Sequence, residues 1–242
     1  MGIISGMLNL VYPAVCGICD RKLLSESDED LSICADCAVK IKKNPAPYCV
    51  KCGRSLRGLV DSVETCWECP KKEFFYERSW SGFLYEGPVK DALHLLKYSK
   101  KLSLGSLFCG LLVRFIKENP EIIEGTDGIA AVPLHSVKFR EREFNQAHLL
   151  AAAIAREFAI TDLSRCLKRA VSTRPQSELD KNERLENVKG TFEVIKPTLV
   201  YNKNLLIVDD LFTTGATLNE CSRALKKTRA GKLNCLTFAR GA

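Results

Sequence analysis

Residues 205–217 of the chain read LLIVDDLFTTGAT, an apolar run that ends in two carboxylates and a short loop of small and hydroxyl-bearing residues. The apolar run has the length and composition of a buried strand. Such a strand would hold Asp209 and Asp210 at its carboxyl end, and the turn that follows can aim backbone N–H groups and hydroxyls at a phosphate. The stretch therefore predicts a site for a phosphorylated sugar. The hydroxyls belong to Thr213, Thr214 and Thr217.

Strands and helices alternate on both sides of this stretch. The hydrophobic pattern predicts strands at residues 79–85, 128–132, 205–208 and 233–239, and helices at residues 87–96, 104–116, 146–158 and 217–229. Such alternation is typical of an α/β fold with a largely parallel sheet that helices cover on both faces. Ligands of these folds bind at the carboxyl ends of the strands, where the loop after residue 208 is expected.

A second loop with anion-binding chemistry is expected at the same edge of the sheet. Residues 132–146 read VPLHSVKFREREFNQ and carry basic residues at alternate positions, Lys138, Arg140 and Arg142. In an extended conformation these side chains point the same way, toward a polyanion such as pyrophosphate that arginine can bind through two hydrogen bonds. A solvated basic loop is the alternative for each of them taken alone.

Four C-x-x-C pairs occupy the N-terminal part of the chain, and this spacing is typical of zinc knuckles. Two such pairs complete a closed, structural four-cysteine site. We expect two Zn²⁺ sites built from consecutive pairs, although pairing of the first knuckle with the third is an alternative, as are reduced or disulfide-linked cysteines. The first site would contain Cys16, Cys19, Cys34 and Cys37, and the second Cys49, Cys52, Cys66 and Cys69.

Composition divides the chain into two parts. A polar stretch ends the cysteine-rich part, so we expect a double zinc-ribbon domain over residues 1–73 and a second domain over residues 74–242. The net charge of +7 and the pI of about 8.8 favour polyanionic ligands without selecting among them. No apolar stretch reaches the ~20 residues that a membrane helix needs, and residues 1–15 lack the features of a signal peptide, so we expect no membrane span and a cytoplasmic location.

The motifs together resemble known families. Residues 208–217 resemble the phosphoribosyl pyrophosphate (PRPP) signature of type I phosphoribosyltransferases. The sequence VPLH at residues 132–135, followed by the basic loop and by FNQA at residues 144–147, resembles the ComF family. ComF proteins join an N-terminal double zinc ribbon to a phosphoribosyltransferase domain, and residues 85–88, 96–98 and 187–190 also follow in the expected order. Glu143 stands where the family usually has glycine. A left-handed backbone there would be strained, and the carboxylate would lie near the basic loop.

The resemblance implies a type I phosphoribosyltransferase fold and a site for PRPP with Mg²⁺. Asp209 and Asp210 would accept hydrogen bonds from the ribose hydroxyls or approach the magnesium ion, and a mobile catalytic loop at residues 169–187 would carry Arg174. His135 could contact the donor or be satisfied by a nearby backbone carbonyl. The expected donor-binding residues besides the two aspartates are Thr213, Thr214, Gly215, Ala216, Thr217, Leu134, His135, Lys138, Arg140 and Arg142.

Three functions are compatible with these features. The first is transfer of a phosphoribosyl group to an unidentified nitrogen base or other nucleophile, held by a hood built mainly from residues 74–112. The second is sensing of PRPP without transfer, for which Glu143 is the motivating residue. The third is binding of single-stranded DNA or of DNA-uptake and recombination proteins, as the ComF resemblance implies.

Basic residues near the ribbons could contribute to the third function, and a solvated surface is the alternative reading of them. Two aromatic residues could stack on bases. The basic residues are Lys40, Lys42, Lys43, Lys51, Arg54 and Arg57, and the aromatic ones are Tyr48 and Trp67.

Overall fold

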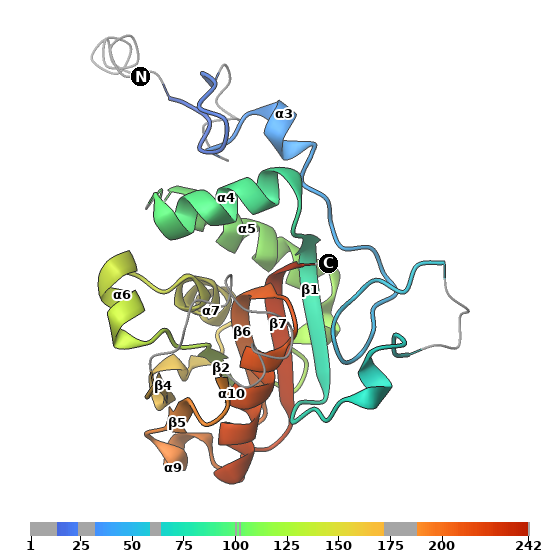
Figure 1. Cartoon of the computed structure of the whole chain (residues 1–242), viewed down its shortest axis with the longest axis vertical. Helices are drawn as coiled ribbons and strands as arrows, with labels where there is room; N and C mark the ends of the chain where they lie inside the picture. The colour runs from blue at the N-terminus through green and yellow to red at the C-terminus, as the bar shows by residue number, and fades with distance from the viewer. Residues whose placement is uncertain are drawn as a thin grey trace.

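A five-stranded parallel sheet forms the centre of the fold (Figure 1), with the strand order β1-β7-β6-β2-β3. The computed structural model describes residues 14–23, 32–58, 64–99, 101, 103–171 and 188–241. The strands are β1 (Arg78–Leu84), β2 (Gly128–Ala131), β3 (Thr161–Asp162), β6 (Leu205–Phe212) and β7 (Leu233–Arg240), and β4 (Leu167–Arg169) pairs antiparallel with β5 (Phe192–Val194) in a separate small sheet. The predicted α/β class with a mainly parallel sheet is confirmed.

Helices cover the sheet and connect its strands. α7 packs on β2 and β6, α5 packs on α7, and α10 contacts β6 and crosses in front of the sheet in Figure 1. The main helices are α4 (Gly87–Tyr98), α5 (Ser103–Glu118), α6 (Ser136–Arg142), α7 (Gln146–Glu157) and α10 (Ala216–Lys227), and the short ones are α3 (Ala35–Ala38) and α9 (Pro197–Val200). Single 3₁₀ turns lie at η1 (Cys69–Lys71), η2 (Pro120–Ile122) and η3 (Ser164–Cys166). No helix in these described ranges is long and apolar enough to cross a membrane.

Strand β6 extends further than its apolar run predicts. The first four residues, through Val208, are buried on both faces, as expected for a central parallel strand. The strand continues to Phe212 because it stays paired with β7, up to the partners Phe212 and Arg240. Its other neighbour ends earlier, with Ala131 of β2 opposite Val208. The two aspartates therefore lie within β6 but beyond the end of β2, where one edge of the strand is open.

The cysteine-rich part packs against the free edge of β1. Backbone hydrogen bonds join Leu84 N to the carbonyl of Lys42 (3.0 Å), Asn44 N to that of Gly82 (2.9 Å) and Ser79 N to that of Val50 (2.8 Å). These bonds cover an edge strand that would otherwise expose unpaired backbone groups. The domain boundary between residues 73 and 74 stays a prediction.

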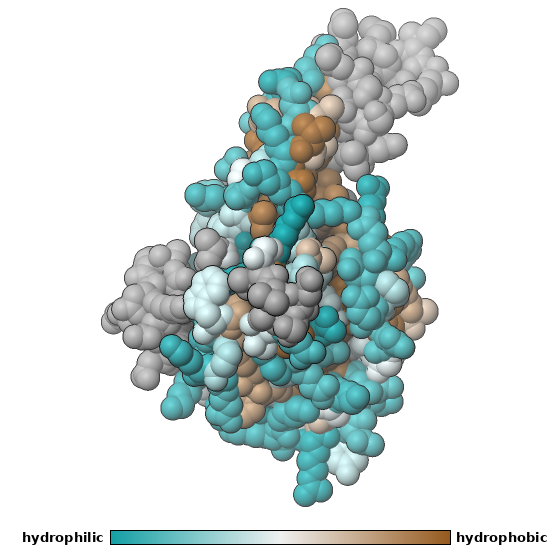
Figure 2. Space-filling view, turned by 90° about the vertical axis from the view of Figure 1, so that its right-hand side faces the viewer, coloured by the Kyte–Doolittle hydropathy of each residue, from teal (hydrophilic) through white to brown (hydrophobic). Residues whose placement is uncertain are grey.

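The N-terminal end of the described chain forms a narrower extension. The broad lower part of the face in Figure 2 is mainly hydrophilic, and hydrophobic residues show on the upper part, where Figure 1 places α3. Val39, just after α3, is 81% exposed. The extension contacts the rest of the molecule through Lys101, whose ammonium lies 3.3 Å from the carbonyl of Gly17 and 2.6 Å from the carboxylate of Asp20.

Candidate functional site

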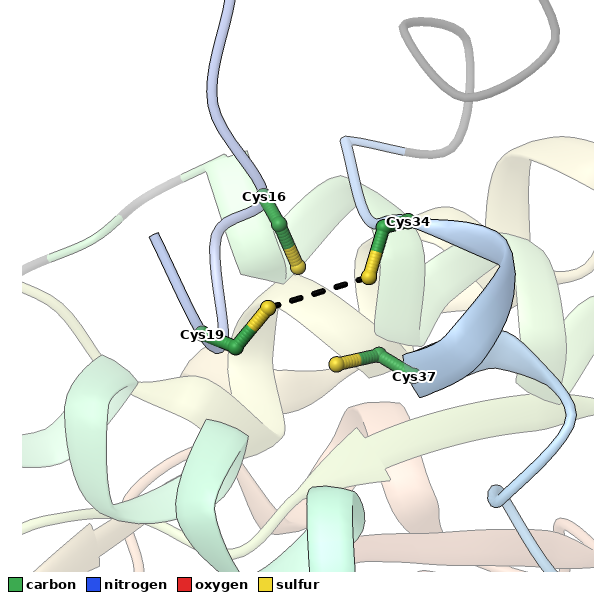
Figure 3. A group of neighbouring side chains, drawn as sticks. All are labelled: Cys16, Cys19, Cys34 and Cys37. Atoms are coloured by element: carbon green, nitrogen blue, oxygen red, sulfur yellow. Dashed lines mark hydrogen bonds between the residues drawn. The ribbon is translucent and has the colours of Figure 1, made fainter. Parts of the chain in front are cut away.

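Two clusters of four cysteines form in the order expected from consecutive pairs. The Sγ atoms of Cys16, Cys19, Cys34 and Cys37 lie within 4.8 Å of one another and point toward a common centre (Figure 3), and those of Cys49, Cys52, Cys66 and Cys69 lie equally close. The alternative pairing of the first knuckle with the third is therefore excluded. All eight cysteines are free, so the disulfide alternative is excluded as well.

The spacing of the sulfur atoms fits a tetrahedral ion. Bonds of ~2.3 Å from zinc to four thiolates place the sulfurs ~3.8 Å apart. The Sγ–Sγ distance is 3.7 Å between Cys19 and Cys34, and the neighbouring sulfurs of the second cluster lie 3.5 to 3.7 Å apart. Within the second cluster the hydrogen bond with Cys52 and backbone N–H groups lower the pKa of the Cys49 thiol to about 4, whereas the hydrogen bond with Cys49 raises the pKa of Cys52 and burial raises that of Cys69. Both clusters therefore suit structural Zn²⁺.

A cavity of about 680 Å³ opens at the carboxyl ends of β2 and β6. It lies where the strand order and the early end of β2 leave room above the sheet. Its lining residues come from the β2–α6 segment, from α4, from β4 and from β6 with the loop that follows. They include Leu134, Lys138, Arg142, Asn145, Tyr85, His94, Lys97, Tyr98, Arg169, Asp209, Asp210, Thr213 and Thr217.

The acidic pair lies at the floor of this cavity. Burial and the neighbouring charge of Asp210 raise the pKa of Asp209 to about 8, although its Oδ1 accepts a hydrogen bond from the backbone N–H of Asp210 at 2.8 Å. Burial also acts to raise the pKa of Asp210, but the Lys97 ammonium outweighs it and the net shift is downward. The pair therefore carries its negative charge mainly on Asp210 near neutral pH.

Lys97 of α4 holds the charged member of this pair. Its ammonium lies 2.5 Å from Oδ2 of Asp210, and the two side chains are 19% and 14% exposed. Burial alone would lower the pKa of Lys97, but the two carboxylates raise it. Lys97 is not among the site residues predicted from the sequence, because a lysine in the last turn of an amphipathic helix is also what the helix dipole favours. Its presence in the segment 96–98, which follows the ComF order, was the available signal.

The basic segment after β2 is helical, so the expected extended conformation is wrong. Residues 136–142 form α6, where side chains four positions apart share a face and alternate ones do not. Lys138 and Arg142 accordingly line the cavity, while Arg140 does not. Arg142 also lies 5.9 Å from the ring centroid of Tyr98.

Two further predicted residues, His135 and Glu143, lie at the two ends of α6. His135 caps the N-terminus of the helix, and its Nδ1 accepts a hydrogen bond from the backbone N–H of Val137 at 3.3 Å. Its partner is thus a backbone N–H group, whereas the expected alternative to donor contact was a backbone carbonyl. His135 is not among the residues that line the cavity, although Leu134 is. Glu143 ends the helix with φ of +66°. The backbone is therefore left-handed at the position where the family usually has glycine, although this residue carries a side chain.

The loop after β6 divides its residues between two hollows. Thr213 and Thr217 line the cavity, and Thr213 and Thr214 line a second hollow, whereas Gly215 and Ala216 are not among the lining residues of either. Gly215 has φ of +79°, and a Cβ there would lie 2.6 Å from the ring of Phe212. The turn therefore requires glycine at the point where α10 begins.

The expected catalytic loop contains two arginines of interest, Arg169 and Arg174. Arg174 lies in residues 172–187, outside the described residues, but Arg169 at the start of the expected catalytic loop lines the cavity. Burial lowers the pKa of the Arg169 guanidinium, which lies 5.3 Å from the ring of Phe192.

Asn145 caps α7 and donates a hydrogen bond to the carbonyl of Val132 at 2.9 Å, which fixes the loop between them. An asparagine before an amphipathic helix is the signal that could have found this cap.

Comparison with known families identifies both parts of the chain. Residues 7–70 match the double zinc ribbon domain, and residues 145–242 match the phosphoribosyl transferase domain. The chain therefore combines a double zinc ribbon with a phosphoribosyltransferase domain.

Curated relatives extend over most of the chain. It is 28% identical to competence protein F of Haemophilus influenzae over 212 residues, which cover 86% of this chain and 90% of the relative. It is 27% identical to DNA utilization protein YhgH of Salmonella typhimurium, with coverage of 96% and 99%, and 26% identical to competence protein ComFC of Bacillus subtilis, with coverage of 95% and 96%. The resemblance to the ComF family is confirmed.

Proposed function

We propose that this protein binds PRPP with Mg²⁺ in the cavity above β2 and β6 and transfers its phosphoribosyl group to a nucleophile. The observation that supports this most is the meeting of an acidic pair with several cations at one sheet edge, between the threonine-bearing loop after β6 and the basic helix α6. The match to the phosphoribosyl transferase domain supports the same chemistry.

The loop after β6 suits the 5′-phosphate of the donor. α10 begins at Ala216, so the first N–H groups of this twelve-residue helix face the end of the loop. Thr213 and Thr217 add hydroxyls from the cavity wall, and Arg174 remains a proposed contributor from the catalytic loop. Phosphate is therefore assigned to this loop.

The cations on the opposite wall suit the pyrophosphate. Lys138 and Arg142 line the cavity from one face of α6, and a guanidinium can bind a phosphate through two hydrogen bonds. Their positive charge would stabilise the negative charge that builds up on the leaving group. Arg140, on another face of the helix, is not assigned to this role.

The acidic pair suits the ribose hydroxyls and a magnesium ion. Carboxylate oxygens are hard ligands of the kind Mg²⁺ prefers, and the position of Lys97 shows that the pair already attracts a positive charge. Asp209 and Asp210 would hold Mg²⁺ together with the substrate's phosphates, and the ion would supply positive charge against the leaving pyrophosphate.

The chemistry needs no covalent nucleophile from the protein. The bond between the anomeric carbon and the pyrophosphate oxygen breaks, its electron pair leaves with pyrophosphate, and the acceptor's lone pair forms the new bond. The acceptor loses a proton to water or to the released pyrophosphate. Asp209 and Asp210 beside the sugar would stabilise the positive charge that develops at the anomeric carbon.

Calorimetric titration of PRPP in the presence of MgCl₂ tests the donor assignment. We expect binding by the wild-type protein, and about tenfold or weaker binding by Asp209→Ala, because the carboxyl group that would contact the ribose hydroxyls or Mg²⁺ is lost. Asp91→Asn, on the exposed face of α4, is the matched control and should bind like the wild type. Equal affinity of all three proteins, or no binding by any, would contradict the proposal.

A role in the use of imported DNA is the second candidate, supported by relatives named for competence and for DNA utilization. The ribbon surface offers few cations for it. Lys42 and Lys43 pair with Glu86 and Glu118, and Lys51 donates to two backbone carbonyls. Single-stranded DNA binding with a steep salt dependence would support this role, and retention of that binding by Arg57→Ala would argue against the ribbon as its site.

Sensing of PRPP without transfer gives a different result in the same assays. A sensor would bind PRPP and Mg²⁺ but release no pyrophosphate with any acceptor. We propose transfer over sensing because the pyrophosphate-facing residues Lys138 and Arg142 remain on the cavity side of α6 despite the left-handed Glu143. We also propose a cytoplasmic location, where thiols stay reduced and available for zinc.

A further inference from the structure

Arg240, the last residue of β7, is a buried arginine to which the proposed function gives no role. It is 7% exposed, and it lies opposite Leu84 of β1 and Phe212 of β6. A buried guanidinium is costly unless hydrogen bonds and a negative charge compensate it. Arg240 lines a second hollow of about 430 Å³, which lies between the second zinc cluster and the loop after β6. Both of these neighbours are therefore available to compensate it.

The Arg240 guanidinium binds the start of the loop after β6. Its Nη1 donates to the carbonyls of Phe212 and Thr213 at 3.4 and 3.1 Å. The backbone N–H of the next residue, Gly241, donates to the same Phe212 carbonyl at 2.8 Å. These bonds fix the point where the loop leaves the sheet, and Thr213 is one of the residues that line the donor cavity.

The side chain of Phe212 extends this support to the other end of the loop. Its ring is buried, and the Cζ atom of Arg240 lies 4.7 Å from the ring centroid. The ring packs against Gly215, where a Cβ would lie 2.6 Å from it. The next residue, Ala216, begins α10. Arg240 and Phe212 therefore support the loop between the strand that precedes it and the helix that follows it.

The second zinc cluster supplies negative charge beside this guanidinium. Cys52, Cys66 and Cys69 line the same hollow as Arg240. Burial lowers the pKa of Arg240, and the negative charges of these three cysteines oppose that effect. Four thiolates that hold one Zn²⁺ keep two net negative charges, so the metal-loaded cluster attracts a cation as well.

The carboxylate that lines the hollow interacts with two other cations. An oxygen of Glu68 lies 3.2 Å from Nη2 of Arg54, and its second oxygen lies 3.9 Å from Nζ of Lys72. The side chains of these two cations are 27% and 31% exposed, so water also stabilises their charge. Glu68 thus compensates the more exposed cations, and the cysteines of the second cluster act on the buried Arg240.

Several contacts hold the second cluster at a fixed place on the sheet. The side-chain amide of Asn44 donates to the carbonyls of Gly53 and Ser81 at 2.7 and 3.0 Å, and the hydroxyl of Tyr76 donates to that of Lys51 at 2.7 Å. Gly53, with φ of +64°, lies against β1, where a Cβ would have contacts of 3.1 to 3.2 Å. The cluster therefore cannot move away from the buried guanidinium without breaking these contacts.

We propose that Arg240 is a positioning residue that holds the loop after β6 in its phosphate-binding conformation, and that the second zinc cluster compensates its charge. The inference rests on the proposed binding of PRPP. Metal binding and local folding of such a cluster are coupled, so loss of zinc would release the cysteines from their place beside the guanidinium. Zinc in the second cluster and PRPP in the cavity therefore strengthen each other's binding, equally in both directions.

Two variants of Arg240 test the positioning role by calorimetric titration of PRPP with MgCl₂. Arg240→Met should weaken binding about tenfold or more, and Arg240→Lys, which keeps the charge, should recover part of the loss. Arg114→Met, on the exposed face of α5, is the control and should bind like the wild type. Misfolding alone lowers the number of binding sites per chain but leaves the affinity of the folded fraction unchanged. Unchanged affinity in Arg240→Met would overturn the positioning role.

The zinc affinity of the wild-type protein tests the link to the second cluster without a change at Arg240. Equilibrium competition with a zinc chelator that binds Mg²⁺ weakly measures the affinity of both ions. PRPP with MgCl₂ should strengthen the binding of one ion about fivefold or more and leave the other unchanged. The ion that remains in Cys19→Ser should show this effect, and the ion that remains in Cys52→Ser should not. Equal effects of PRPP on both ions, or no effect on either, would overturn the link.

The same competition assay separates this inference from the proposed function. If the wild type does not bind PRPP, the proposed function fails, but Arg240→Met should still weaken zinc binding by the second cluster, because the cluster loses its counter-charge. Unchanged zinc affinity in this variant would overturn the charge compensation. If PRPP binds with the same affinity to the wild type, Arg240→Met and Cys52→Ser, the positioning inference fails and donor binding stands.

Discussion

The ammonium of Lys97 in α4 and the carboxylate of Asp210 in β6 form a largely buried ion pair with an N–O distance of 2.5 Å. The pair connects the helix above the cavity to the strand beneath it. Removing one member of a buried ion pair leaves the other charge without compensation, and that is the main energetic cost. The pair therefore both supports α4 and sets the charge of the acidic site.

Lys97→Ala should destabilise the protein by about 3 kcal/mol, because Asp210 would remain buried beside Asp209 without its partner. Urea unfolding measures the change. The exposed Lys90 on the same helix is the control, and Lys90→Ala should change stability by less than about 0.5 kcal/mol. Equal unfolding of the two variants would show that the pair contributes little.

Arg142→Ala should weaken PRPP binding about tenfold or more, and Arg140→Ala should have little effect, because only Arg142 of these two lines the cavity. Calorimetry with Mg²⁺ present gives both affinities. The two variants make the same change of charge on one helix, so a general electrostatic effect would weaken binding equally. That result would remove the assignment of α6 to pyrophosphate.

Glu143→Gly should be more stable than Glu143→Ala by about 1 kcal/mol, because a left-handed backbone is strained in a residue that carries a Cβ. Glycine loses somewhat more conformational entropy on folding, which reduces this difference but does not cancel it. Both variants remove the carboxylate, so their difference in thermal unfolding reports the backbone alone. An alanine variant as stable as the glycine variant would show that the turn relaxes.

Glu220 should stabilise the protein near neutral pH and lose this effect in acid. Burial raises the pKa of its carboxyl, but Arg223 and the backbone N–H of Gly190 at 2.7 Å outweigh burial and lower it below the ordinary value. A lowered pKa in the folded state gives stability that is present above the unfolded pKa and is lost as pH falls through the folded one.

The stability difference between wild type and Glu220→Gln measures this contribution. It should be about 1 to 3 kcal/mol at pH 7 and should shrink below about pH 4, the region of an unperturbed glutamate. Urea unfolding at several pH values gives the difference, and the loss of zinc in acid affects both proteins alike. A difference that does not change with pH would rule out the carboxylate's charge as its cause.

The two zinc clusters should contribute unequally to stability. Cys19→Ser and Cys52→Ser should each lower the zinc content from two ions to one, measured by elemental analysis, because each belongs to a different four-cysteine cluster. Cys52→Ser should lower the melting temperature by about 5 °C more, because the second cluster packs on β1. The same melting temperature in both variants would contradict that structural role.

Local patterns predicted much of the fold. The apolar run at residues 205–208 and the amphipathic stretches identified the main strands and helices, and the C-x-x-C spacing identified both zinc clusters. The observed ends of these elements differ from the predicted ones where strand pairing sets them. β6, for example, continues to Phe212 because it stays paired with β7. The basic segment was misread because alternating charges suit an extended chain, whereas the caps at His135 and Glu143 close a helix.

The sequence alone determined which chemical groups are present, because the knuckles, the acidic pair and the threonine-bearing loop after β6 each depend on residues that are close along the chain. Only the tertiary structure decided which of these groups meet. Lys97 pairs with Asp210, Arg142 lines the cavity while Arg140 does not, and Arg240 lies between the second zinc cluster and the loop after β6. These contacts join segments far apart in the sequence, and the order and unequal lengths of the paired strands place them together.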